Sequence, residues 1–139
     1  MKIYALIFLP LILLNCKKQP DKIIGTWKMV HAEVLENDSL KIKDLSQTRF
    51  IKIINDTHFA FFNQQNNGNE KFYGGGGTYT FDGSNYTETL NFTSVESMKD
   101  HEFSFKIHIK EDSLIQTGLE HVKEAGINRE ITEKYIRIH

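Results

Sequence analysis

The chain has 139 residues, 40% of them hydrophobic and 12% aromatic, which predicts one domain with a buried core and excludes wholesale disorder. Its net charge is -1, from 17 basic and 18 acidic residues, so it lacks the basic excess of a nucleic-acid-binding protein, and we expect no nucleic-acid partner. Its 2 prolines both precede residue 21, so nothing after them interrupts a hydrogen-bonded sheet.

The N-terminus has the features of a secretory signal. A positive residue, Lys2, is followed by an apolar stretch over residues 3–14, which is too short to span a bilayer. This stretch ends just before Cys16, the only cysteine of the chain. The arrangement resembles a bacterial lipoprotein signal, in which the cysteine becomes lipidated after cleavage. The alternative is an ordinary signal peptide followed by an unrelated cysteine.

The lipoprotein resemblance implies three segments. Residues 1–15 would be the signal peptide, residues 16–22 the lipidated cysteine and a polar tether, and residues 23–139 the folded domain. Acyl chains on Cys16 would hold the protein at a membrane. The expected location is the bacterial cell envelope, at the outer membrane.

The first strand of the domain is expected at residues 25–34. Regular alternation places on one of its faces Gly25, Trp27, Met29, His31 and Glu33. The polar residues that follow, 35–47, are interpreted as a loop.

The other strands are separated by turn-forming residues. They are expected at residues 49–54, 58–62, 78–81, 86–92, 101–110, 114–117 and 130–138. Four glycines at residues 74–77 open one strand and indicate a bulge or a close approach of two backbones. Residues 95–98 favour a single helical turn. Residues 119–126 are ambiguous, with Gly126 placed where a short helix would end.

About eight short strands with short connections predict an all-β fold with at most short helical turns. We expect an antiparallel up-and-down barrel, because closure removes the exposed edges of the sheet. The interior of a barrel of about eight strands has room for packed side chains or for one small ligand.

Two short motifs carry a family resemblance. Gly25-Thr26-Trp27 and Tyr135-Ile136-Arg137 are similar to the first-strand and last-strand motifs of lipocalin-type proteins, the calycin superfamily. In that superfamily the tryptophan closes the barrel base and the arginine packs over the indole. The resemblance implies a lipocalin-like lipoprotein with Gly25, Trp27 and Arg137 at its base, where a cation–π contact contributes ~1–2 kcal/mol.

We expect alternating aromatic residues to line the interior. The predicted ligand-binding residues are Met29, His31, Phe59, Phe61, Tyr79, Glu88, Phe103, Phe105 and Tyr135. Glu88 shares a face with Tyr86, Leu90 and Phe92, so an inward carboxylate would need a partner. His31 would be a second polar anchor, near the mouth. Alternatively, the aromatic side chains simply fill the core.

We expect no catalytic residue, no metal site and no cofactor. The 6 histidines form no close pair on one strand face, and no Gly-x-Ser-x-Gly motif occurs. The leading hypothesis is a membrane-anchored, non-catalytic protein that binds a small hydrophobic or amphipathic ligand inside its barrel. A filled barrel acting as a protein-interaction subunit of the cell envelope is the alternative. An enzyme using Glu88 and His31 as an acid–base pair is a third hypothesis.

Overall fold

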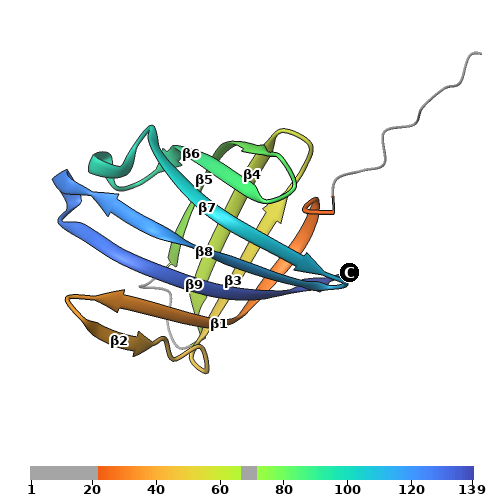
Figure 1. The fold of residues 1–139 in the computed structure, drawn as a ribbon, viewed down its shortest axis with the longest axis horizontal. Helices are drawn as coiled ribbons and strands as arrows, with labels where there is room; N and C mark the ends of the chain where they lie inside the picture. The colour runs from red at the N-terminus through yellow and green to blue at the C-terminus, as the bar shows by residue number, and fades with distance from the viewer. Residues whose placement is uncertain (1–21, 67–71) are drawn as a thin grey trace, which may run out of the picture.

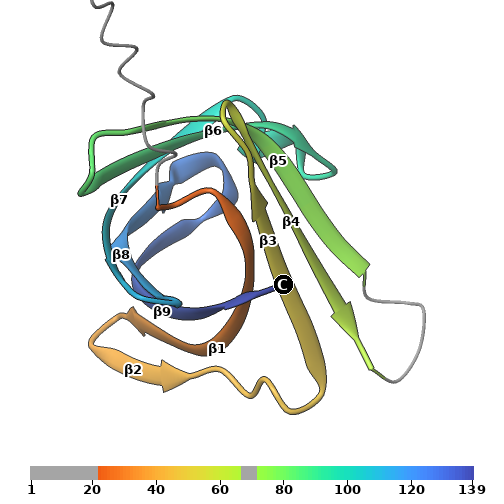
Figure 2. The same cartoon turned by 90° about the vertical axis from the view of Figure 1, so that its right-hand side faces the viewer.

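The computed structural model describes residues 22–66 and 72–139. The expected signal peptide, Cys16 and residues 17–21 of the tether lie outside the described residues. The described chain forms one antiparallel sheet in the order β2-β1-β3-β4-β5-β6-β7-β8-β9, and pairing of β1 with β9 closes it (Figure 1). The predicted all-β barrel is therefore confirmed. Figure 2 shows the closed ring of strands.

The strands have the following bounds: β1 Gly25–Glu36, β2 Ser39–Ile42, β3 Thr48–Ile54, β4 His58–Gln65, β5 Phe72–Phe81, β6 Asn85–Thr93, β7 His101–Lys110, β8 Ser113–Val122 and β9 Ile127–Ile138. Eight of them, β1 and β3 to β9, make the barrel, while β2 pairs only with β1. Helical structure in the described residues is limited to two 3-10 turns, η1 Glu96–Met98 and η2 Lys123–Ala125.

All eight predicted strands are present, and all of them except β7 are longer than predicted. β7 has the predicted bounds, and η1 lies in the predicted helical turn. Gly126 ends η2 in the left-handed conformation, with φ 66°, after β8 has continued to Val122. The predicted loop at residues 35–47 is wrong in part, because it contains β2. Asn37 and Asp38, both with positive φ, form the tight turn between β1 and β2.

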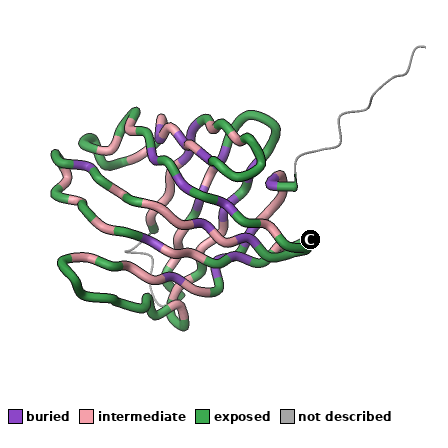
Figure 3. Tube along the Cα trace, viewed as in Figure 1, coloured by how far each residue is buried: buried purple, intermediate pink, exposed green. Residues whose placement is uncertain are grey.

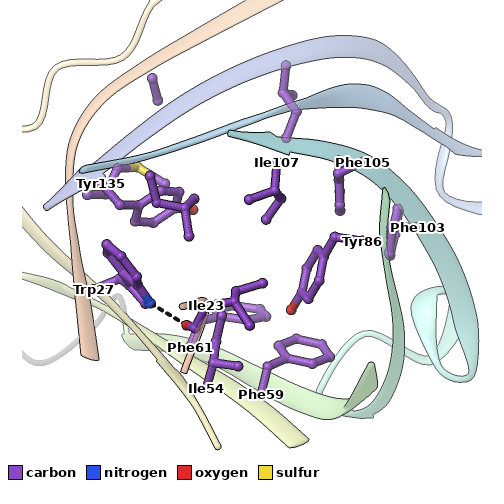
Figure 4. Packing of buried hydrophobic residues seen from close by; sticks show 14 of the residues in the cluster. Ile23, Trp27, Ile54, Phe59, Phe61, Tyr86, Phe103, Phe105, Ile107 and Tyr135 are labelled. Atoms are coloured by element: carbon purple, nitrogen blue, oxygen red, sulfur yellow. Dashed lines mark hydrogen bonds between the residues drawn. The ribbon is translucent and has the colours of Figure 1, made fainter. Parts of the chain in front are cut away.

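A tryptophan and an arginine occupy the end of the barrel where β1 begins and β9 ends. Trp27 is fully buried, and its Nε1 donates a hydrogen bond to the Ile23 carbonyl at 2.8 Å (Figure 4). The Arg137 guanidinium carbon lies 4.1 Å from the indole centroid. Arg137 Nη1 and Nη2 donate hydrogen bonds to the carbonyls of Ile24 and Lys22 at 2.7 and 2.6 Å. These bonds hold the residues that precede β1 across this end of the barrel.

Gly25 is the residue that lets the arginine approach. It has φ 150°, and a Cβ at this position would lie 2.2 Å from Arg137 Nη1. A side chain at Gly25 would therefore displace the guanidinium from the indole. The glycine, the tryptophan and the arginine form one packed unit.

A β-bulge in β1 reverses the alternation that the sequence predicts. Met29 pairs with Tyr135, but His31 pairs with Lys134, so one extra residue lies between them on β1. Beyond the bulge Ala32 is buried, whereas its neighbours His31 and Glu33 are partly exposed. The predicted inward face of His31 and Glu33 is therefore wrong, because a shift of one residue moves every later side chain to the other face.

A second register shift lies between β5 and β6. Gly76 pairs with Phe92, whereas Thr78 pairs with Thr89. A Cβ on Gly77 would lie 1.8 Å from the Thr89 carbonyl oxygen, so the backbones approach here as the glycine run predicts. The shift turns Phe92 outward, with 68% of its surface exposed, which corrects its predicted position on the face of Glu88.

The pairing along β1 is uneven. Only Gly25, Thr26, Trp27 and Lys28 pair with β3, in four residue pairs, whereas nine pairs join β1 to β9. After the bulge β1 departs from β3 and pairs with β2 instead.

Trp27→Ala should lower the free energy of unfolding by ~3–5 kcal/mol, because it removes a fully buried ring and the partner of Arg137. Urea denaturation measures the change. Phe92→Ala is the control, and a change within ~0.5 kcal/mol is expected there because the ring is exposed. Equal stability of Trp27→Ala and the parent would contradict the role of the indole.

Candidate functional site

The interior of the barrel is lined largely by aromatic rings. Buried positions alternate with exposed ones along the strands (Figure 3), and the buried rings converge inside the barrel (Figure 4). Of the predicted ligand-binding residues, the following are buried: Met29, Phe59, Phe61, Glu88, Phe103, Phe105 and Tyr135. Tyr79 is partly buried, its ring centroid lies 5.4 Å from that of Tyr86, and its hydroxyl donates to the Asn55 carbonyl at 2.8 Å.

A charged pair crosses this aromatic interior. Lys52 of β3 and Glu88 of β6 are 4% and 9% exposed, and Lys52 Nζ lies 2.8 Å from Glu88 Oε2. Lys52 Nζ also donates to Oε1 of Gln116 of β8 at 3.1 Å. The carboxylate that the sequence placed inside thus has a cationic partner, as burial of a charge requires.

The polar network extends to the last strand. Gln116 Nε2 donates to Glu133 Oε2 at 3.5 Å, and the Tyr135 hydroxyl donates to the same oxygen at 2.6 Å. Burial raises the pKa of the Glu133 carboxyl, against the lowering effects of its bond from Tyr135 and the charge of Lys52. Burial, with the charge of Glu133 second, raises the pKa of Tyr135.

The Tyr86 hydroxyl is the exception in this network. Tyr86 is fully buried, and its hydroxyl has no hydrogen-bond partner among the described residues. Lys52 Nζ lies 4.9 Å from the centroid of its ring, on the ring face. Burial, and next the charge of Glu88, raise the pKa of Tyr86, so the phenol keeps its proton. The interior therefore contains a neutral donor that lies close enough to the Glu88 carboxylate to interact with it but makes no hydrogen bond of ordinary length.

Sequence reasoning missed most of this network. Lys52 alternates with Phe50 and Ile54, so parity alone places it inside, yet a lysine between apolar neighbours gives no sign of burial by itself. The available signal was Glu88, whose need for a cation points to the few basic residues at inward positions. Gln116 and Glu133 have no comparable sequence signal.

The structure does not bring His31 and Glu88 together. His31 Nε2 lies 2.7 Å from Glu33 Oε1 on the outward side of β1, and both side chains are about one-third exposed. Glu88 lies inside the barrel with Lys52. The geometry gives no support to an acid–base pair of these two residues.

Within residues 22–66 and 72–139, no group of three or more His, Cys, Asp or Glu side chains is arranged to hold a metal ion. Within the same ranges no helix has the length and apolar character needed to cross a membrane.

The fold and interior define a closed eight-stranded antiparallel barrel with a polar network in an aromatic core, which fits a lipocalin-like fold. A family model described as a domain of unknown function (DUF4488) matches residues 22–139, and the chain belongs to this family. No curated protein matches the chain.

Lys52→Met should lower the free energy of unfolding by ~3–5 kcal/mol, because it leaves the Glu88 carboxylate buried without its cation. The double variant Lys52→Met/Glu88→Met should recover most of this loss, since an apolar pair of similar volume has no charge to desolvate. Urea denaturation of the three proteins measures both effects. A single variant as stable as the parent would contradict the buried ion pair.

Glu133→Gln should change how stability depends on pH. A carboxyl with a raised folded-state pKa stabilises the fold fully below its ordinary pKa of 4.5, and this stability is lost as the pH rises through the folded value. The variant cannot ionise there, so its advantage over the parent should grow as the pH rises from 4.5 to the folded-state pKa and stay constant at higher pH. Denaturation at several pH values tests this, with the exposed Glu130→Gln as control. A constant difference would contradict the raised pKa.

Proposed function

We propose that this protein binds a small amphipathic molecule inside its barrel and is held at the bacterial envelope by lipid on Cys16. It would act by binding and not by catalysis. The barrel provides an aromatic interior, and the polar network provides a fixed point at which a ligand can be oriented. The polar end of the ligand would lie at the network and its apolar body against the rings.

The observation that carries this proposal is the Tyr86 hydroxyl. It makes no hydrogen bond of ordinary length, although the Glu88 carboxylate interacts with it, and a buried donor that is poorly paired costs up to ~1–3 kcal/mol. An oxygen acceptor supplied by a ligand would remove this cost. The preferred ligand class is therefore an apolar molecule that carries a carbonyl or another acceptor oxygen.

The charge of Lys52 supports the same class. Its ammonium has three N–H donors, and the hydrogen bonds to Glu88 and Gln116 use two of them. Because Glu88 already neutralises the ammonium, the polar end of the ligand needs no full negative charge. A neutral acceptor is sufficient.

Native mass spectrometry of protein purified from its own host tests ligand binding. We expect the parent to carry a small molecule and Tyr86→Phe to carry less of it, with equal or higher stability in the ligand-free state because an unpaired hydroxyl is removed. Tyr79→Phe is the matched control, since its hydroxyl already has the Asn55 carbonyl as acceptor. Repeated recovery of the parent without any small molecule would contradict the proposal and favour a filled barrel.

Membrane anchoring has a separate test. Cys16→Ser removes the only thiol that can be acylated, so we expect the protein to move from the membrane fraction to the soluble fraction of its host. Immunoblots of both fractions measure the distribution. A variant that still sediments with the membranes would contradict anchoring through Cys16.

A further inference from the structure

The outer face of β4, β5 and the end of β6 carries an apolar hollow of about 410 Å³. We call it the phenylalanine groove, and it is formed mainly by Ala60, Phe62, Phe72, Gly74, Gly76 and Phe92. Its glycines have no side chains to cover the strand surface. The rings of Phe62 and Phe72, with centroids 6.4 Å apart, form part of its wall. The groove lies outside the barrel and is distinct from the polar interior.

The strand register assembles this groove. Ala60 pairs with Gly76 and Phe62 pairs with Gly74 across β4 and β5. Gly76 also pairs with Phe92 of β6, which the register shift has turned outward. Three strands thus contribute aromatic or side-chain-free positions to one outer surface.

The exposure of these rings is unusual for a surface in water. Phe62, Phe72 and Phe92 are 42%, 59% and 68% exposed, and the lining of the groove contains no Asp, Glu, Lys or Arg. The outer face of β7 is different, with the exposed residues Glu102 and Lys106. A contiguous apolar patch on one side of a barrel indicates a contact surface.

The chain outside the described residues indicates what this surface meets. Only residues 17–21 separate Cys16 from Lys22, and an extended chain of this length spans about 20 Å. Lys22 lies at the end of the barrel where Gly25 pairs with Ile54, and β4 starts shortly after Ile54. A lipid on Cys16 would therefore keep the barrel, and the start of β4, close to the bilayer.

We propose that the phenylalanine groove docks on the lipid bilayer, with its three exposed rings inserted at the boundary between headgroups and acyl chains. This inference rests on the proposed anchoring through Cys16, which supplies proximity but does not set which side of the barrel faces the lipid. The groove lining contains no Asp, Glu, Lys or Arg, and its one titratable side chain is His58, so little charge has to leave water when the groove meets lipid. The anchor and the groove would together fix the orientation of the barrel.

Tryptophan fluorescence in vesicles tests the orientation. The full chain, as isolated from host membranes, is placed in vesicles of phosphatidylethanolamine and phosphatidylglycerol, with or without brominated acyl chains that quench nearby indoles. Phe92→Trp places a probe in the groove, and Ser104→Trp places one at an exposed position on β7, away from Lys22. The parent, whose only tryptophan is the buried Trp27, provides the background to be subtracted.

We expect brominated lipid to quench the probe of Phe92→Trp and to leave that of Ser104→Trp unchanged. Equal quenching at the two positions, or none at either, overturns the docking of the groove, whether or not the chain floats with the vesicles. Flotation reports the anchoring separately. A chain that floats with an unquenched groove probe would retain the anchor and refute the docking.

Discussion

The contact between Arg137 and Trp27 ties together three parts of the barrel that are far apart in the sequence. The guanidinium belongs to β9, the indole belongs to β1, and the carbonyls that the arginine binds belong to residues that precede β1. A single, largely buried cation thus joins the last strand, the first strand and the chain that covers the end of the barrel. Every feature of the interior depends on this closure, because an open sheet would expose the charged pair to water.

The interior that this closure protects is not built for maximal stability. A buried ion pair gains little over apolar residues of similar volume, because desolvation offsets most of the attraction between Lys52 and Glu88. The Tyr86 hydroxyl, which makes no hydrogen bond of ordinary length, adds a further cost. Polar groups that stabilise poorly but are held in fixed positions are expected where a protein must recognise something, and this supports the proposed binding role.

Much of the fold was predictable because local and global signals agree. Alternation in β7 and the spacing of turn residues gave the strand pattern, and the glycine run marked a close approach of backbones. The two register shifts were not predictable. Each depends on how a neighbouring strand pairs, and each reverses which residues face inward, which is why His31 and Phe92 were placed on the wrong face. Lys52 was missed because burial of a lysine depends on partners from other strands.

The short pairing between β1 and β3 has a consequence for motion. Four residue pairs join these strands, fewer than at any other junction of the barrel wall, and they all lie at the end held by the indole and the guanidinium. Local opening costs least where the fewest backbone bonds break. The barrel wall therefore opens most easily between β1 and β3. The opening strand stays fixed at the end that contains Trp27 and is free at the other end, where β1 pairs with β2.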